Sequence, residues 1–149
     1  MRAAKKCGVR VPEVTLLDFG KPVLAVERFD RVVTIDEEGL RVERIHQEDF
    51  AQAFGMTSAS KYVELPNGSI ASIAQWIRSY AAKPTEDLSQ FAKAVCFNYL
   101  IGNCDAHLIN ISIMYRVGKK GPIRRLSPAY DLVSTSFFDR FSKELAMAV

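Results

Sequence analysis

Two aspartates and an asparagine in the C-terminal half of the chain have the types and order that phosphoryl transfer needs. Asp105 precedes Asn110 by five positions, and Asp131 follows later. In such a site one aspartate accepts the proton of an attacking hydroxyl, while the asparagine and the later aspartate hold Mg²⁺ on the phosphates of a nucleotide. The sequence therefore predicts Asp105 as the catalytic residue and Asn110 and Asp131 as magnesium ligands.

Asn103, Asp105 and Asn110 also have a purely structural interpretation, because asparagine and aspartate cap turns routinely. Taken alone, the Asp105–Asn110 spacing favours that interpretation, and its functional weight comes from the surrounding segments. His107 has only His46 as a companion histidine and belongs to no HExxH motif, so it is expected to hydrogen-bond and fix the loop rather than to bind a metal. Cys104 has no activating base in the sequence and is interpreted as a packing residue.

A helix before this loop and a hairpin after it should position the three residues. Apolar residues at helical spacing predict a long helix that begins near Thr85, its expected N-cap, and ends at Gly102. Strands are predicted at 111–117 and 122–126, around a turn at 118–121. A loop that is fixed at both ends can hold a carboxylate and an amide oxygen converging on one point.

The rest of the chain reads as strands followed by helices. Runs rich in β-branched residues predict two hairpins, one from 14–19 and 23–29 and one from 32–36 and 40–45. Helices are predicted at 3–7, 47–54 and 69–82. Strands, then helices, then a loop on a small hairpin indicate an α+β fold.

Composition restricts the class of protein. The 149 residues are 48% hydrophobic and 25% charged, as expected for one globular domain. A net charge of +3, carried by dispersed lysines and arginines, does not indicate direct nucleic-acid binding. Three cysteines without a C-x-x-C pair favour a reducing, cytoplasmic location. No apolar run is long enough to span a membrane, so no membrane partner is expected.

Taken together, four segments resemble the HipA family, the bacterial toxin-type serine/threonine kinases paired with HipB-like antitoxins. The first two are Val-Pro-Glu-Val at 11–14 and Val-Glu-Arg-Phe-Asp-Arg at 26–31. The third is Arg-Ile-His-Gln-Glu-Asp-Phe at 44–50, followed by Lys61-Tyr62, and the fourth is the block 97–110 that continues at 127–131. The resemblance covers positions 3–137, which is nearly the whole chain.

The resemblance implies a bilobal, protein-kinase-like fold that uses ATP and Mg²⁺ to phosphorylate a serine or threonine on a protein. By position, Asp105 matches the family's catalytic aspartate, while Asn110 and Asp131 match its Mg²⁺-binding pair. Glu27 and Phe29 match the strand whose backbone meets the adenine in the family. His107 and Tyr130 match residues that line the nucleotide site.

The same resemblance implies how the chain is divided. Residues 1–30 match a remnant of the small lobe and the hinge, and residues 31–149 match the larger lobe with the catalytic loop. The family's phosphate-cradling loop and its phosphate-pairing lysine lie upstream of the matched part, and most of its later helices are also absent. The chain is therefore expected to be a fragment, split subunit or truncated product with little activity alone. Its implied partner is a HipB-like antitoxin or a subunit that carries the small lobe.

One departure from the family pattern bears on the chemistry. Family members carry a lysine just before the asparagine of the catalytic loop, and here that position is Ile109. A cation near the transferring phosphoryl group stabilises its charge, so its loss should slow the reaction. A non-catalytic remnant that binds an antitoxin-like partner or a nucleotide is therefore the alternative. A phosphotransferase acting on a small molecule also stays open, because this site does not select a protein substrate.

Overall fold

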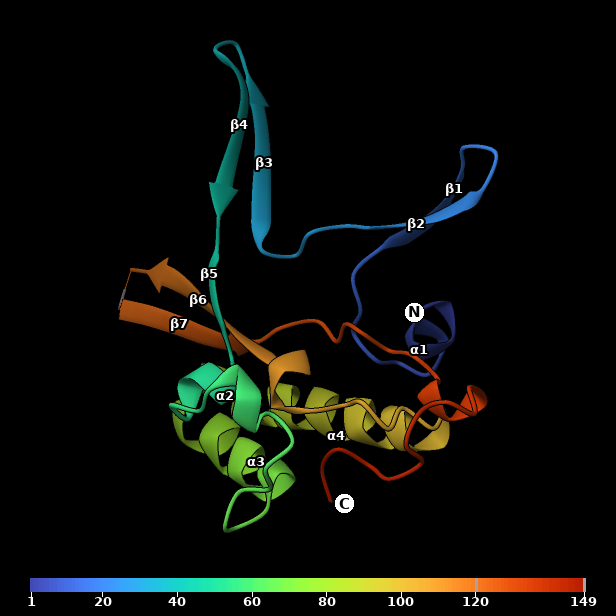
Figure 1. Ribbon diagram of the computed structural model, residues 1–149. Helices are drawn as coiled ribbons and strands as arrows, with labels where there is room; N and C mark the ends of the chain where they lie inside the picture. The colour runs from blue at the N-terminus through green and yellow to red at the C-terminus, as the bar shows by residue number, and fades with distance from the viewer. Residues whose placement is uncertain (120, 149) are drawn as a thin grey trace.

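Two packed helices below a three-stranded antiparallel sheet form the body of the chain in the computed structural model, which describes residues 1–119 and 121–148. The sheet has the order β5 (His46–Asp49), β6 (Ser112–Gly118), β7 (Gly121–Leu126), and the helices are α3 (Ser69–Tyr80) and α4 (Pro84–Leu100) (Figure 1). The predicted hairpin at 111–126 is confirmed as β6–β7. Lys120, in its predicted turn, lies outside the described residues.

The main core lies between these helices and the sheet. Ile73 and Ile77 come from the inner face of α3, one helical turn apart, and Phe91 faces them from α4. Their cluster is completed by residues of α2 (Phe50–Ala53), the turn η2 (Leu108–Asn110), the sheet and the C-terminal segment, namely Phe50, Ala51, Leu108, Ile113, Leu126 and Met147. Because Leu108 is fully buried in this core, the turn that carries Asn110 is fixed to the body.

A buried carboxylate joins the N-terminal segment and the sheet to α4. Asp87 is fully buried, and its two oxygens accept hydrogen bonds from Arg125 Nε and Nη2 at 2.8 and 3.0 Å. It also accepts the Leu126 amide at 3.1 Å, and Arg10 Nη2 lies 3.4 Å from it. A second small cluster of Ala4, Val9 and Phe97 packs α1 (Arg2–Lys6) onto the same helix.

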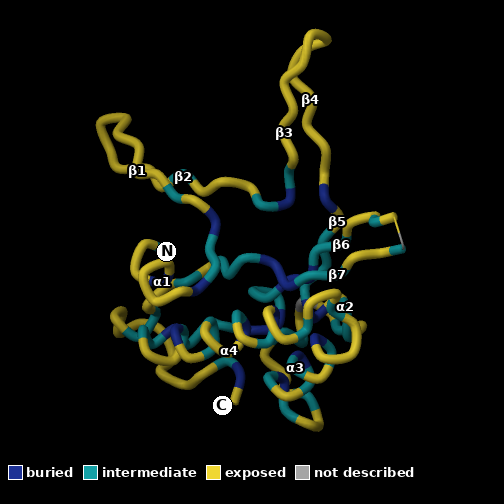
Figure 2. Tube along the Cα trace, turned by 180° about the vertical axis from the view of Figure 1, so that it is seen from behind, coloured by how far each residue is buried: buried dark blue, intermediate teal, exposed yellow. Residues whose placement is uncertain are grey.

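Two hairpins project from the body, as Figure 1 shows. They are β1 (Val14–Asp18) with β2 (Pro22–Val26), and β3 (Arg31–Asp36) with β4 (Gly39–Arg44). Both were predicted from the sequence. Their residues are mostly exposed (Figure 2), including apolar ones such as Phe19 and Ile35, which are 75% and 79% exposed. The described part of the chain is therefore mixed α/β with small antiparallel sheets, and it has no helix that could cross a membrane.

Several predicted boundaries were wrong, including the following three. Positions 47–49 are not helical but pair with β6, and the helix begins only after Asp49, whose side chain accepts the Gln52 amide in a capping box. The α4 helix begins two residues earlier than predicted, with Lys83 rather than Thr85 as N-cap and Pro84 in its first turn. Strand β2 ends at Val26, so Glu27 and Phe29 lie in the connection that follows it.

The end of α4 depends on a glycine that no other residue can replace without strain. Gly102 has φ +64°, and a Cβ at this position would lie 1.9 Å from Ser136 Oγ. We expect Gly102→Ala to lower the unfolding free energy by about 1–2 kcal/mol for the backbone and about 1–3 kcal/mol more for the overlap. Urea unfolding measures the loss.

Gly55 provides the matched control for this prediction. It has a similar φ of +69°, but a Cβ there would meet nothing within 4 Å. Gly55→Ala should therefore show only the backbone cost, and equal losses at the two glycines would rule out the predicted overlap with Ser136.

Candidate active site

The loop between α4 and η2 carries Asp105 and is held by the C-terminal segment. The Gly102 carbonyl accepts the Ser136 amide at 2.9 Å and the Thr135 hydroxyl at 3.2 Å, and Thr135 Oγ1 in turn accepts the Cys104 amide at 2.7 Å. Thr135 and Ser136 belong to the short turn η3 (Thr135–Phe137). The C-terminal segment is thus a structural support of this loop.

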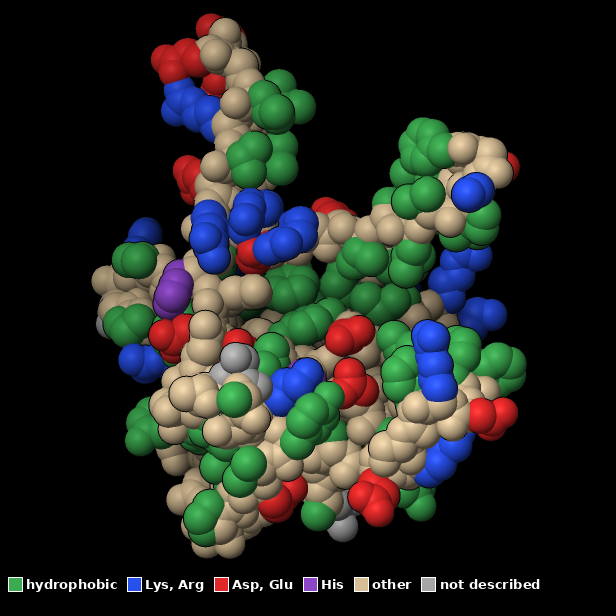
Figure 3. Space-filling view, in the orientation of Figure 1, with side chains coloured by type: hydrophobic (Ala, Val, Ile, Leu, Met, Phe, Trp, Pro, Cys, Tyr) green, Lys and Arg blue, Asp and Glu red, His purple; other side chains and the backbone are tan. Residues whose placement is uncertain are grey.

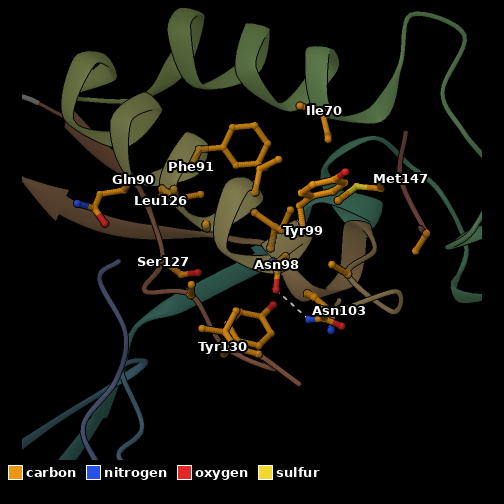
Figure 4. A pocket seen from close by; sticks show the side chains of 18 of the residues that line it. Ile70, Gln90, Phe91, Asn98, Tyr99, Asn103, Leu126, Ser127, Tyr130 and Met147 are labelled. Carbon is orange, nitrogen blue, oxygen red and sulfur yellow. Dashed lines mark hydrogen bonds between the residues drawn. The ribbon is translucent and has the colours of Figure 1, made fainter. Parts of the chain in front are cut away.

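Asn103 connects the two predicted aspartates. Its side chain is almost fully buried, and its Oδ1 accepts the Asp105 amide at 3.3 Å. Its Nδ2 donates to the Asp131 carbonyl at 3.1 Å and to Asn98 Oδ1 at 2.9 Å. Figure 4 shows the Asn98–Asn103 bond on the wall of a cavity that is apolar on the side of Ile70 and Phe91. The backbones of both aspartates are therefore fixed through one amide.

Asn110 and Asp131 lie side by side. Asn110 Nδ2 donates to Asp131 Oδ2 at 2.5 Å, while Asn110 Oδ1 is buried and has no hydrogen-bond partner among the described residues. Asp131 has φ +55° and is the one non-glycine residue in the described part of the chain with positive φ. This left-handed conformation costs energy for most residues, and such strain concentrates at functional sites.

The Asp105 carboxylate is half-exposed and meets two other side chains. Tyr62 donates its hydroxyl to Asp105 Oδ1 at 2.6 Å, and His107 Nε2 lies 3.8 Å from the same oxygen. The Tyr62 ring packs edge-on against His107, with 5.2 Å between ring centroids. Asp105, Asp131 and Tyr62 line one open depression of the surface.

His107 is buried and has a lowered pKa. Burial is the largest cause, and the nearby charge of Lys61 adds to it, whereas Asp105 and Asp131 act in the opposite direction. The native imidazole is therefore favoured in its neutral form. Its Nδ1 has no hydrogen-bond partner among the described residues. The role of His107 in fixing the loop stays a prediction.

This lowered pKa predicts a loss of stability in mild acid. An unfolded histidine titrates near pH 6.5, above native His107, so the unfolded chain binds more protons between the two pKa values. We expect the unfolding free energy contributed here to be constant above about pH 6.5, to fall as the pH drops through it, and to level off below the native pKa. Chemical unfolding at a series of pH values measures this slope.

The two histidines allow the slope to be assigned. His107→Gln should remove the slope in that pH window, whereas His46→Gln, at an exposed position, should keep it. A slope that survives in His107→Gln would contradict the prediction.

Tyr130 lies between the turn η2 and the connection after β2. Its hydroxyl donates to the Ile109 carbonyl at 2.7 Å and lies 2.5 Å from Ser112 Oγ, and its ring stacks on Phe29 at 5.7 Å. Burial raises the pKa of Tyr130 to about 12, so the hydroxyl stays protonated. Tyr130, Phe29 and Glu27 line a second depression, while Asp131, the next residue in the chain, lines the first.

A buried carboxylate that pairs with two arginines fixes the connection that carries Glu27 and Phe29. Arg28 donates to both oxygens of buried Asp30 at 2.7 and 2.6 Å, and Arg31 also bonds to Asp30. These bonds, chiefly those from Arg28, lower the pKa of Asp30 to about 2 despite its burial. Figure 3 shows basic side chains gathered where the β3–β4 hairpin leaves the body. The carboxylate at the centre of these contacts is buried.

The predicted site residues thus form two groups. Asp105 and Asp131 share the first depression, with His107 and Asn110 in direct contact with them, and Glu27, Phe29 and Tyr130 share the second. Sequence reasoning assigned no role to Tyr62 or Thr135 and treated Asn103 only as a turn residue. The segment Lys61-Tyr62 was singled out, which is a signal for Tyr62, but nothing local indicated its contact with a residue 43 positions away.

Comparison with known proteins finds relatives of one family. The family model described as the HipA-like C-terminal domain matches residues 1–149. "Putative kinase Y4mE" of Sinorhizobium fredii is 37% identical over 150 residues, which are 100% of this chain and 34% of that protein. "Serine/threonine-protein kinase toxin HipA" of Shewanella oneidensis is 35% identical over 164 residues, covering 100% of this chain and 36% of that protein.

A solved structure is similar over the same region. It is HipA of Shewanella oneidensis MR-1 in a complex with HipB and its operator DNA, with a TM-score of 0.82 and 32% sequence identity. The match covers 99% of this chain and 36% of that one. The chain spans about a third of the length of the curated relatives that it matches.

Proposed function

Because this chain belongs to the family of HipA-like C-terminal domains, we propose that it carries the catalytic residues of an ATP- and Mg²⁺-dependent serine/threonine protein kinase. In this proposal residues 1–30 are the hinge and a remnant of the small lobe of a kinase-like fold, and residues 31–149 belong to the larger lobe. A HipB-like antitoxin is the proposed partner, in line with the HipB complex of the Shewanella relative.

The pairing of Asn110 with Asp131 is the observation that supports this proposal most. Mg²⁺ at a nucleotide takes one or two protein oxygens and leaves its other positions to phosphates and water. Asp131 Oδ2 is one such oxygen, and the buried Asn110 Oδ1 is an acceptor without a partner among the described residues. Exchanging the two ends of the Asn110 amide by rotation would turn that oxygen toward Asp131. The residues present therefore fit the metal.

The other residues receive roles from their positions. Asp105 would accept or orient the hydroxyl of the substrate, since its carboxylate is half-exposed in the depression that Asp131 also lines. Glu27, Phe29 and Tyr130 would contact the nucleotide base in the neighbouring depression, and His107 would support the loop. Bound Mg²⁺ would neutralise negative charge on the transferring phosphoryl group.

A calorimetric titration of ATP into this chain, with and without Mg²⁺, tests the proposal. We expect saturable binding that needs Mg²⁺ and that weakens roughly 10-fold or more in Asp131→Asn. Asparagine tolerates the left-handed backbone of position 131, so this variant removes the charge with little strain. Asp139→Asn, at a fully exposed carboxylate, is the control. A folded chain that binds no ATP in the presence of Mg²⁺ would contradict the proposed nucleotide site.

The second candidate is a non-catalytic module that binds an antitoxin-like partner or a nucleotide. One observation favours it: Ile109 packs against the apolar core, at the position where the resemblance leads one to expect a lysine. ATP binding without transfer to any protein hydroxyl would select this candidate.

A further inference from the structure

The carboxylate of Asp105 is held by a residue from a different part of the chain. Two side chains approach Asp105 Oδ1 in the described structure: the Tyr62 hydroxyl at 2.6 Å and His107 Nε2 at 3.8 Å. Only the first distance is that of a hydrogen bond. Because the Tyr62 phenol can donate and the carboxylate accepts, this is a charge-assisted bond, which is stronger than one between neutral groups.

Tyr62 is itself fixed on the side away from Asp105. Its ring packs edge-on against His107, and Lys61 Nζ lies 4.7 Å from the ring centroid. The Val63 amide donates to the Ser60 carbonyl at 2.9 Å, which closes a turn around Tyr62. The next residue, Glu64, accepts the Ser69 amide at the start of α3 and the Ala148 amide at 3.2 Å. The segment is therefore tied to the body although the Tyr62 side chain is 55% exposed.

A single bond to one oxygen orients the whole carboxylate. With Oδ1 bonded to Tyr62, no hydrogen bond to Oδ2 is found among the described residues, and the side chain is 48% exposed. A proton acceptor in catalysis must present a free oxygen at hydrogen-bond distance from the attacking hydroxyl, and a misplacement of about 1 Å can lower the rate roughly 10²-fold.

We propose that Tyr62 is a positioning residue for the reaction: its hydroxyl holds Oδ1 of Asp105 and thereby presents Oδ2 to the substrate hydroxyl. This inference rests on the proposed function for its catalytic part. Its structural part, the dependence of the Asp105 carboxylate on the Tyr62 hydroxyl, stands without it.

Tyr62→Phe tests the structural part because it removes the hydroxyl and keeps the ring. The side-chain carboxyl carbon of Asp105 is observed by NMR in the ¹³C-labelled chain, and its signal is assigned with Asp105→Asn. We expect Tyr62→Phe to shift this signal. Tyr80→Phe is the matched control, since Tyr80 is 57% exposed and packs on Trp76, and it should leave the signal unchanged. An unchanged Asp105 signal in Tyr62→Phe would overturn the proposal whatever the chain's activity.

A kinetic experiment tests the catalytic part. We expect Tyr62→Phe to lower the transfer rate from ATP at saturating Mg²⁺ roughly 10- to 100-fold while the dissociation constant for ATP with Mg²⁺ stays within about 2-fold. If Tyr62 had a merely structural role, the substitution would change both the transfer rate and the dissociation constant, or neither of them. An unchanged rate would overturn the positioning role, and so would a faster one, because it would mean that the phenol blocks the hydroxyl position.

The two experiments separate this inference from the proposed function. If the wild-type chain binds no ATP or transfers no phosphoryl group, the proposed kinase activity of the chain fails and the catalytic part fails with it. The Asp105 signal then still decides whether Tyr62 holds the carboxylate.

Discussion

Replacing Asp105 with asparagine is expected to lower phosphoryl transfer by about 10²–10⁴-fold, which is the usual contribution of a positioned acid or base. Asparagine has nearly the same size and keeps an oxygen that can accept the Tyr62 hydroxyl, so the loop should stay in place. It cannot take up a proton from the substrate. The measurement is transfer of the γ-phosphoryl group from ATP to a protein hydroxyl, at saturating Mg²⁺.

Binding of ATP separates this effect from damage to the site. Asp105→Asn should bind ATP with Mg²⁺ as the wild type does, whereas Asp131→Asn should lose binding, because the two aspartates have different proposed roles. Asp139→Asn, in the exposed tail, should change neither quantity. If Asp105→Asn transferred phosphate at the wild-type rate, the assignment of Asp105 as catalytic residue would be wrong.

Asp87→Ala is expected to cause a large loss of stability, about 3–5 kcal/mol of unfolding free energy. The carboxylate is fully buried, and its removal leaves Arg125 Nε and the Leu126 amide without their acceptor. Arg10 also loses a contact, although it keeps its bond to the Leu126 carbonyl at 2.6 Å. Guanidinium unfolding followed by circular dichroism measures the loss.

The preceding residue makes a sharp control. Glu86 also pairs with Arg125, at 3.1 Å, but its side chain is 56% exposed. Exposed ion pairs contribute about 0–1 kcal/mol, so Glu86→Ala should have little effect. Similar losses in the two variants would mean that burial is not what makes the Asp87 contacts important.

Local sequence patterns predicted the helices and the hairpins, whose partner residues lie close together in the sequence. The hairpins β1–β2, β3–β4 and β6–β7 and the helices α3 and α4 were all found near their predicted positions, because runs of β-branched residues around turns and apolar residues at helical spacing are signals within each segment. The strand β5 was missed because its partner β6 lies more than sixty positions further along the chain. The capping pair Asp49–Gln52 is visible in the sequence and could have placed the start of α2 correctly.

In the candidate site, too, local patterns were predictable and long-range contacts were not. The order of Asp105, Asn110 and Asp131 indicated a shared function, and Asn110 and Asp131 are indeed in contact. Their roles in catalysis and metal binding stay predictions. The contacts that hold them could not be predicted, since Tyr62, Thr135 and Ser136 reach the loop from segments about 30–40 residues away, and no local pattern encodes such a contact.

The backbone of Asp131 limits how this position can evolve. Among residues other than glycine, aspartate and asparagine adopt positive φ most readily, because their short polar side chains bond locally to the backbone. A change to glutamate would keep the negative charge but would meet the full conformational cost. Selection for folding alone would thus confine the position to glycine, asparagine and aspartate. Of these three residues only aspartate carries a charge, so a lineage that lost the need for that charge could drift to asparagine or glycine at little cost in stability.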